Sequence, residues 1–469
     1  MADSLSQVST MSRQEKRASI GLAGIFSMRM LGLFMILPVM SLYAEELIGV
    51  TPLLLGLAIS VYGLTQALLQ IPFGLLSDRF GRKRIITIGL LLFVSGSIVA
   101  AMSTTIYGVI LGRALQGSGA VAAAVMALAA DLTLEQNRTK IMATIGISIG
   151  ISFGVAMVLG PLLASFAGLS GIFWFTAVLA FGAIVILHKV VPDASKLTIH
   201  KDAEPIPALM AKVLKDGQLL RLDFGIFCLH LVMTAMFVVL PLLLRGKLGL
   251  AAEDHWMVYL PVLALSVVVM VPFVIVAEKK RKMKLVFVSA VGVLSLASFA
   301  LYLFSESLWG MVATLFVFFT AFNLLEATLP SLISKIAFAG GKGTAMGVYS
   351  SSQFFGAFCG GLLGGFIWDS YGLSSVFLMC GGVLFIWFLV AFGMKSPGHM
   401  TSLLKHLELQ TAEQAKQITA KLLAIKGVLD VGISVDDSTA YLKVDNDLLD
   451  EEALDAIFLN LQSCPEGQE

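Results

Sequence analysis

Long apolar stretches alternate with short polar turns along most of the chain. Many of these stretches approach the roughly 20 residues that an α-helix needs to cross a bilayer. A crossing segment must be helical, because lipid offers no hydrogen-bond partner to backbone polar groups. The pattern predicts an all-α polytopic membrane protein. Its twelve transmembrane helices are expected over residues 19–44, 52–78, 85–102, 105–131, 139–165, 170–190, 221–246, 255–277, 285–304, 308–335, 344–368 and 374–394.

One long connection divides the predicted helices into two sets of six. It contains the stretch EPIPALMAKVLKDGQLLRLDF, which is typical of an amphipathic helix on a membrane surface. The segments PFGLLSDRFGRKR (Pro72–Arg84) and PFVIVAEKKRKMK (Pro272–Lys284) share a Pro-Phe pair, an acid and a basic run, although basic turns alone produce part of this match. Such a repeat is typical of transporters that bind substrate between two homologous bundles. We therefore expect six-helix bundles over 1–190 and 221–399, with 191–220 as linker.

Composition excludes a soluble enzyme. The chain is 57% hydrophobic and 13% charged, whereas soluble domains carry roughly 25% charged residues. No GxxxxGK[ST] loop and no covalent catalytic constellation occurs, so we expect neither ATP hydrolysis in this chain nor any enzymatic activity or cofactor. The cysteines are scattered without a CxxC pair, which predicts no disulfide and no metal site. They are Cys228, Cys359, Cys380 and Cys464.

Lysine and arginine predict the orientation of the helices. The amino terminus, the even-to-odd loops with the helix ends beside them and the residue after the last helix hold 23 of these residues, whereas the opposite loops and helix ends hold only Arg245 and Lys247. Basic residues collect on the cytoplasmic side of membrane proteins. We therefore expect both termini to be cytoplasmic.

The composition changes near residue 400, which predicts a separate soluble domain over 400–469. This part holds 13 acidic and 5 basic residues, against 18 and 27 in the first 399. Its alternating and helical patterns predict the order βαββα, which suggests a ferredoxin-like sandwich. The stretch KGVLDVGISV resembles heavy-metal-associated domains, but their CxxC is missing and we expect no thiolate metal site. Docking on the basic membrane face, self-association and a solubilising role all remain open for this domain.

Several motifs resemble the major facilitator superfamily, in its drug/proton antiporter branch. The charged turn from Gly74 to Arg84 matches the loop motif G-x-L-x-D-R-x-G-R-[KR]-[KR], and LGRALQGSGA is similar to the second family motif. The stretch GISIGISFGVAMVLGPLLAS looks like the antiporter signature, although Leu-Leu-Ala replaces the usual glycine pair after Pro161. The stretch RMLGLFMILPVMSLYAEEL, together with the soluble tail, is similar to the YajR-type transporters of that branch.

The resemblance implies a conformational latch and a bending helix. Asp78 is expected to face the amino terminus of the eleventh helix, and Arg82 is expected to bridge to Asp131, so that the two halves are held together while the cytoplasmic side is closed. Simple anchoring of the loop is the alternative. The expected latch residues are Gly74, Asp78, Arg79, Gly81, Arg82 and Asp131. The residues expected to bend the fifth helix are Gly150, Gly154, Gly160 and Pro161.

Polar residues inside the predicted helices are candidates for the proton and substrate pathway, because charges facing lipid are costly. Arg29 and Arg113 are expected to face a central cavity, with a structural hydrogen-bond hub as the alternative for Arg113. Glu326 is either a proton carrier or an ion-pair partner of these arginines, and His230 is either functional or satisfied by a carbonyl group. The remaining candidates are Gln66, Gln70, Gln116 and Asn323. Because Arg29 stands where many antiporters have an acid, the identity of the proton carrier stays open.

These observations predict a proton-driven secondary transporter of the bacterial inner membrane. It would export small amphiphilic compounds by alternating access, with the lipid bilayer, the substrate and protons as its partners. A proton-coupled metabolite or sugar transporter is the alternative within the same class. A membrane ligand sensor that signals through the carboxyl-terminal domain is an alternative from another class.

Overall fold

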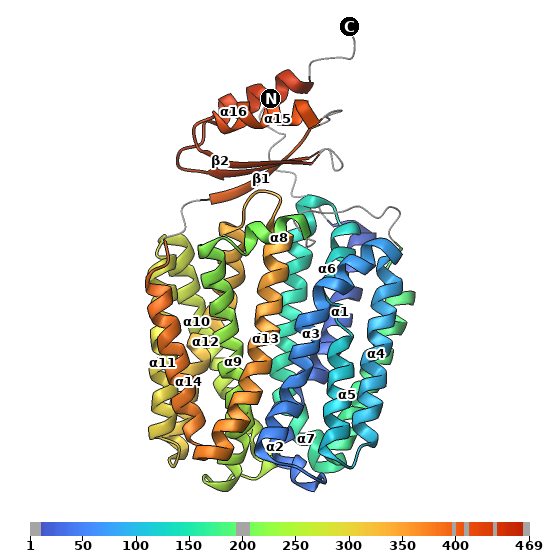
Figure 1. The fold of residues 1–469 in the computed structure, drawn as a ribbon, viewed down its shortest axis with the longest axis vertical. Coiled ribbons are helices and arrows are strands. Elements are labelled where there is room, and N and C mark those ends of the chain that lie inside the picture. Colours follow the sequence, from blue (N-terminus) through green and yellow to red (C-terminus); the bar gives the residue numbers. More distant parts are fainter. Residues whose placement is uncertain (1–10, 194–206, 396–399, 408–411, 435–438, 463–469) are drawn as a thin grey trace.

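Helices dominate the computed structural model, which describes residues 11–193, 207–395, 400–407, 412–434 and 439–462. Figure 1 shows two helical bundles side by side, with a small domain at one end of the pair. We call this the domain end of the bundles, and we call the opposite one the far end.

The first bundle contains the helices before the linker. They are α1 (Arg13–Phe34), α2 (Met40–Tyr43), the 3-10 turn η1 (Ala44–Glu46), α3 (Pro52–Phe80), α4 (Arg82–Met102), α5 (Ile106–Ser118), α6 (Ala122–Asp131) and α7 (Glu135–Lys189). The linker contains α8 (Pro207–Val213), which lies within the predicted amphipathic segment, and the end of that segment is the first part of α9. The second bundle consists of α9 (Gly217–Gly246), η2 (Ala252–Asp254), α10 (Trp256–Lys279), α11 (Met283–Leu303), α12 (Leu308–Ile336), α13 (Lys342–Tyr371) and α14 (Ser375–Phe392).

The twelve predicted crossings are present. In the described part of the chain, ten helices are long and apolar enough to cross a membrane, and one of them, Lys140–Lys189, has 50 residues. This helix turns at Gly168 and so supplies two crossings. The 30-residue α13 is not among the ten, because it is rich in glycine and serine, and it packs between α3 and α9. These helices form the two six-helix bundles expected from the sequence.

Two predicted helices are broken, each for a local reason. The first ends at Phe34 instead of running to residue 44, because Leu37 precedes Pro38 and the α conformation is disfavoured there. The fourth is divided into α5 and α6 at Gly119. The turn predicted between the fifth and sixth helices is found in α7 at Gly168, whose φ of 63° and ψ of −169° suit glycine alone.

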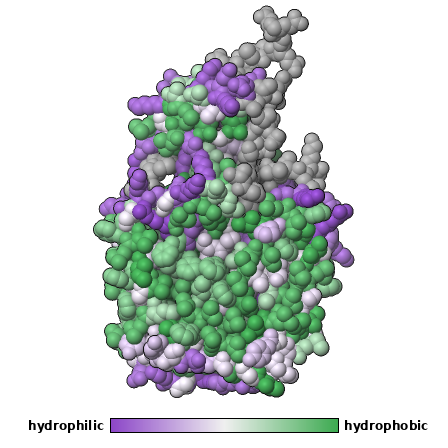
Figure 2. All heavy atoms as spheres, in the orientation of Figure 1, coloured by the Kyte–Doolittle hydropathy of each residue, from purple (hydrophilic) through white to green (hydrophobic). Residues whose placement is uncertain are grey.

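A belt of apolar side chains surrounds the bundles. Figure 2 shows this belt between polar ends, with the more polar small domain beyond one of them. Large apolar residues such as Phe166 and Trp309 are 82% and 80% exposed. An apolar surface of this extent is stable in lipid and not in water. The protein therefore crosses the membrane several times.

The small domain has the predicted order βαββα. Its elements are β1 (Met400–His406), α15 (Ala412–Leu423), β2 (Val428–Ser434), β3 (Thr439–Asp445) and α16 (Glu451–Gln462). The strands pair antiparallel in the order β1-β3-β2. Leu442 and Val444 of β3 belong to the core that also includes Leu422 and Phe458 of the two helices. The neighbouring Tyr441 and Lys443 therefore point to the other face of the sheet.

That other face is docked on the second bundle. The Nζ of Lys443 donates a hydrogen bond to the carbonyl oxygen of Ala337, 2.6 Å away, and Asp430 Oδ2 accepts one from the Ala339 N–H at 2.9 Å. Arg281, in the turn between α10 and α11, pairs with Asp447 at 2.9 Å. Ala337 caps the carboxyl end of α12, where a positive charge is favoured by the helix dipole. The domain thus holds the turn between α12 and α13.

We predict that this docking strengthens as the pH rises. Burial lowers the pKa of Lys443 from 10.5 to about 8. A released domain would expose the ammonium and restore its ordinary pKa, so between these two values the released form binds more protons than the docked form. Stability of the docked state therefore rises with pH through this window. Each unit of pKa difference corresponds to about ten-fold in the docking equilibrium.

Fluorescence energy transfer between labels at Glu413→Cys and Lys279→Cys measures the docked fraction. Lys443→Met is the control, because it removes the titrating group and should make the docked fraction independent of pH. A docked fraction that falls as the pH rises through the window would contradict the prediction.

Candidate functional site

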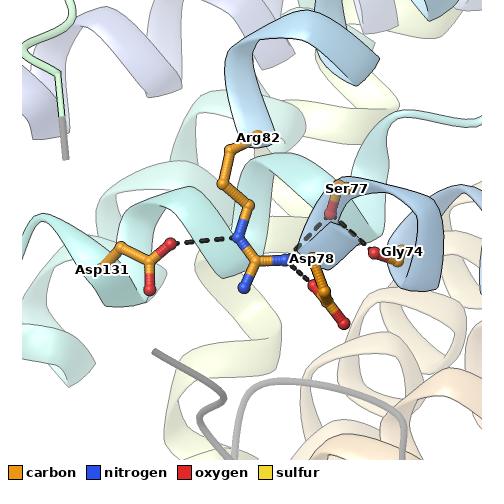
Figure 3. Close-up of polar contacts among 5 residues, drawn as sticks. All are labelled: Gly74, Ser77, Asp78, Arg82 and Asp131. Carbon is orange, nitrogen blue, oxygen red and sulfur yellow. Dashed lines mark hydrogen bonds and ion pairs between the residues drawn. The ribbon is translucent and has the colours of Figure 1, made fainter. Parts of the chain in front are cut away.

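Arg82 is the centre of a charged cluster in the loop motif, shown in Figure 3. Its Nε donates to Asp131 Oδ2 at 3.0 Å, and its Nη1 donates to Ser77 Oγ at 2.9 Å and to Asp78. Ser77 in turn donates to the Gly74 carbonyl oxygen at 2.6 Å. The side chains of Arg82 and Asp131 are 2% and 0% exposed. This cluster ties α3, α4 and α6 together.

The local fold explains why these charges pair. Gly81, with a φ of 97°, turns the chain from α3 into α4 and places Arg82 at the first position of α4. A cation at a helix amino terminus and an anion at a carboxyl terminus, where Asp131 lies, both oppose the helix dipole. Their pairing offsets both penalties.

The cluster lies within the first bundle. Arg82 bridges to Asp131 as the resemblance implied, but the contacts described for Asp78 are with Arg82 and not with the start of α13. Arg79 stacks on Phe80, with its guanidinium carbon 5.5 Å from the ring centroid. The expected latch between the halves is therefore replaced, in this structure, by a brace inside one half.

Arg29 of α1 lies in the interior of the first bundle and is 1% exposed. Its Nη2 donates to Tyr62 Oη at 2.8 Å, to Gln66 Oε1 at 2.6 Å and to the Gly119 carbonyl oxygen at 3.1 Å. Gln66 continues the chain of hydrogen bonds to Gln70. The break between α5 and α6 thus supplies one of the acceptors for Arg29.

Arg113 of α5 is held by the backbone of α3. Its Nε donates to the Ala58 carbonyl oxygen at 3.3 Å and its Nη2 to that of Ile59 at 3.0 Å, while Nη1 donates to Gln116 Oε1 at 2.9 Å. Gln116 also donates to Ser97 of α4 at 2.8 Å. The expectation that Arg113 faces a central cavity is not met, and the contacts are those of the structural hub that was its alternative.

In the second bundle, Glu326 of α12 pairs with His230 of α9. The His230 Nε2 and Glu326 Oε2 atoms are 3.1 Å apart, and Gln353 of α13 lies 2.8 Å from the same ring nitrogen. The side chain of Glu326 is 38% exposed. Asn323, one turn earlier on α12, donates to Ser266 Oγ at 2.8 Å. Glu326 is thus a partner of His230 and not of the arginines, and a carboxylate, not a carbonyl group, satisfies His230.

Sequence reasoning missed several buried polar residues. Asp223 of α9 is 5% exposed, and neither of its carboxylate oxygens has a hydrogen-bond partner among the described residues. Asp223 lies close to the predicted start of its helix at residue 221, and an acidic residue at that place is easily assigned to the preceding loop. Tyr62, Tyr349 and Gln353 were also missed, because tyrosine and glutamine in an apolar segment give no signal without their partners.

The non-helical backbone of α7 does not fall at the glycines expected to bend the fifth crossing. Gly150 and Gly154 lie within a regular part of α7 and have open space around them, and the bend falls at Gly168. A Cβ at Gly160 would lie 2.7 Å from the Met35 carbonyl oxygen. Gly160, which precedes Pro161, therefore allows α7 to approach the turn after α1 closely, and this is a packing role.

Contacts between the bundles include polar ones at the far end. Ser41 Oγ donates to the Val238 carbonyl oxygen at 2.8 Å, and Arg245 pairs with Glu45 at 3.0 Å. Further toward the domain end, the rings of Tyr62 and Phe354 meet edge to face with centroids 6.3 Å apart. The Arg29 cluster therefore borders the interface between the two bundles.

Comparison with known proteins agrees with this architecture. The family model described as the Major Facilitator Superfamily matches residues 22–353. The inner membrane transport protein YajR of Escherichia coli (strain K12) is 48% identical over 432 residues, which cover 92% of this chain and 95% of that protein. The multidrug resistance protein MdtH of Aeromonas hydrophila is 25% identical over 344 residues, covering 72% and 84%.

A solved structure has the same fold. It is a bacterial homologue of the human lysosomal transporter Spinster in an inward-facing and occupied conformation, with a TM-score of 0.68 and 11% identity over 82% of this chain and 97% of that one. At this identity the likeness shows the fold alone. With the family model and the relative at 48% identity, it leads to one conclusion: this chain belongs to the Major Facilitator Superfamily, among the YajR-type transporters.

Proposed function

We propose that this transporter exports small amphiphilic compounds against an inward flow of protons, by alternating access. The observation that carries the proposal is the pair of polar clusters among the transmembrane helices, one in each bundle. The first bundle holds Arg29 at 1% exposure, and the second holds the pair of His230 and Glu326. Ionisable groups inside a membrane are costly and usually mark a pathway.

The His230–Glu326 pair has the chemistry of a proton carrier. Imidazole can accept and release a proton, and a carboxylate 3.1 Å away can share that proton with it. The 38% exposure of the Glu326 side chain gives water a route to that proton. Gln353 connects the pair to α13, the helix that packs on both bundles. A change in the protonation of this pair therefore affects α13, at the interface where the two bundles move relative to each other.

The charge pattern supports the orientation. The domain end carries the loop motif and the other basic turns, and basic loops favour the cytoplasm. Both termini would then be cytoplasmic in a bacterial inner membrane, and the far end would be periplasmic. The far-end contacts Ser41–Val238 and Arg245–Glu45 support a periplasmic closure. In this proposal the Arg82 cluster acts as a latch only after the bundles have moved to close the cytoplasmic side.

The strand order β1-β3-β2 supports the assignment of the small domain as ferredoxin-like. Its docking on the second bundle supports an intramolecular partner for its sheet.

We predict that Glu326→Gln abolishes proton-driven transport while exchange without a gradient continues. The amide keeps the shape and a hydrogen bond to His230, but it cannot carry a proton. The protein is reconstituted into vesicles that contain a pH-sensitive dye, and the dye reports proton movement when a naphthalene compound is added. Anionic, neutral and cationic naphthalene compounds are tested in turn. Gradient-driven transport should fall by at least about ten-fold.

The matched control is Glu306→Gln, an exposed acid paired with Lys247 at the far end, which should leave transport unchanged. Transport in the unmodified protein that ignores the pH gradient would indicate a uniporter and would overturn the proposed coupling.

A further inference from the structure

Arg29 keeps unused hydrogen-bond donors in a buried place. Guanidinium carries five N–H donors and stays charged in proteins. The Nη2 group of Arg29 serves three acceptors, but Nε and Nη1 are buried and have no hydrogen-bond partner among the described residues. A buried donor without an acceptor costs free energy. The donors on Nε and Nη1 therefore point to a group that is absent from the chain itself.

The charge of this region is also uncompensated. The guanidinium carbons of Arg29 and Arg113 lie 5.9 and 5.1 Å from the centroid of the same Tyr62 ring. The partners described for the two arginines are carbonyl, amide and hydroxyl oxygens, all of them neutral. Two like charges around one ring repel each other in a medium of low dielectric constant. An anion close to Arg29 would relieve both the repulsion and the unpaired donors.

The surroundings favour an anion with an apolar body. Arg29 stacks on Phe93 at 5.7 Å as well as on Tyr62. Tyr62 in turn meets Phe354 of α13, so the site borders the interface that opens in alternating access. Aromatic walls beside a guanidinium suit an apolar group attached to a planar or tetrahedral acid.

We infer that Arg29 anchors a binding site for amphiphilic organic anions, which enter between α3 and α13. This inference rests on the proposed function and narrows its substrate class. The acid group accepts hydrogen bonds from Nε and Nη1, and the apolar body lies against Tyr62, Phe93 and Phe354.

Binding to the purified full-length chain in detergent tests the inference without any pH gradient. Naphthalene-2-sulfonate is the anionic probe, and the neutral naphthalene-2-sulfonamide has nearly the same shape. The melting temperature, followed by tryptophan fluorescence, should rise with the sulfonate at concentrations about 30-fold below those needed for the sulfonamide. Equal effects of the two probes would overturn the inference, and so would displacement of the sulfonate by equimolar inorganic sulfate.

Gln66→Glu is the sharpest variant. It places a carboxylate where an amide oxygen now lies 2.6 Å from Arg29 Nη2, and so supplies an internal counter-ion. The ligand-free protein should become more stable, and sulfonate affinity should fall by about 30-fold while sulfonamide affinity stays the same. Gln218→Glu, at the domain end, is the matched control and should change neither. Full sulfonate affinity in Gln66→Glu would contradict the site.

Variants of Arg29 complete the test. Arg29→Gln should lose the preference for the sulfonate, and Arg29→Lys should retain part of it, because the charge stays but the planar fork is lost. If Arg29→Gln does not fold, Gln66→Glu decides the question alone.

A transporter that ignores the pH gradient but prefers the sulfonate would disprove proton coupling and leave this inference standing. A transporter that follows the pH gradient but does not prefer the sulfonate would disprove this inference and leave proton coupling standing.

Discussion

Replacing Arg82 by leucine is expected to destabilise the protein by about 3–5 kcal/mol. The change removes the guanidinium that neutralises Asp131, whose side chain is fully buried, and Asp78 beside it. A carboxylate in the interior that loses this partner keeps its cost of desolvation with less compensation. The melting temperature of the protein in detergent should therefore fall strongly, and α3, α4 and α6 should exchange amide hydrogens faster.

Two further variants distinguish this effect from simple loss of a surface charge. Arg84→Leu, in the same turn but exposed, should change the melting temperature little. The double variant Arg82→Leu/Asp131→Leu should recover much of the loss, because a buried ion pair can often be replaced by apolar residues. Equal effects of Arg82→Leu and Arg84→Leu would refute the idea that burial makes this cluster important.

The second large effect is expected from Gly361→Val, at the contact between the two bundles. A Cβ at Gly361 would lie 2.3 Å from Ser60 Cβ and 2.5 Å from the Gly56 carbonyl oxygen. Backbone atoms cannot yield as side chains do, so α13 must move away from α3. We expect a loss of about 1–3 kcal/mol in stability, together with a wider separation of the bundles at the far end.

Spin labels at Leu53→Cys and Phe366→Cys, both exposed near this contact, would measure the separation. Gly382→Val is the matched control, since a Cβ there has nothing within 4 Å. An unchanged distance between the labels in Gly361→Val would show that the contact between α3 and α13 does not hold the far end together.

Hydropathy predicted the number and order of the crossings, because a bilayer imposes a length and a composition on each of them. It could not predict the break after Phe34, which depends on the backbone conformations of a few residues. Its separate fifth and sixth helices agree with the structure, in which Gly168 interrupts the helical backbone between the two crossings. The βαββα order of the small domain followed from alternation of apolar residues in short strands.

The site was harder to predict than the fold. Arg29, Arg113 and Glu326 stood out because charges are rare in apolar segments, but a single sequence does not say which groups meet. Arg113 binds carbonyl oxygens of α3, and Glu326 binds His230 across 96 positions of the chain. Asp223 was not recognised because it lies two residues from Arg221 at the predicted start of a helix, and charged residues close together are typical of a loop. Pairings across helices depend on how the helices rotate, and hydropathy holds little information about that rotation.

The small domain is fixed to the second bundle by the hydrogen bonds of Lys443 to Ala337 and of Asp430 to Ala339, and this has a practical consequence for imaging. Most of a transporter is hidden in its detergent belt, which leaves electron cryo-microscopy few landmarks for alignment. Here an antibody fragment raised against the outer helices α15 and α16 would be carried rigidly by the second bundle, and its outline would report the tilt of that bundle in every particle.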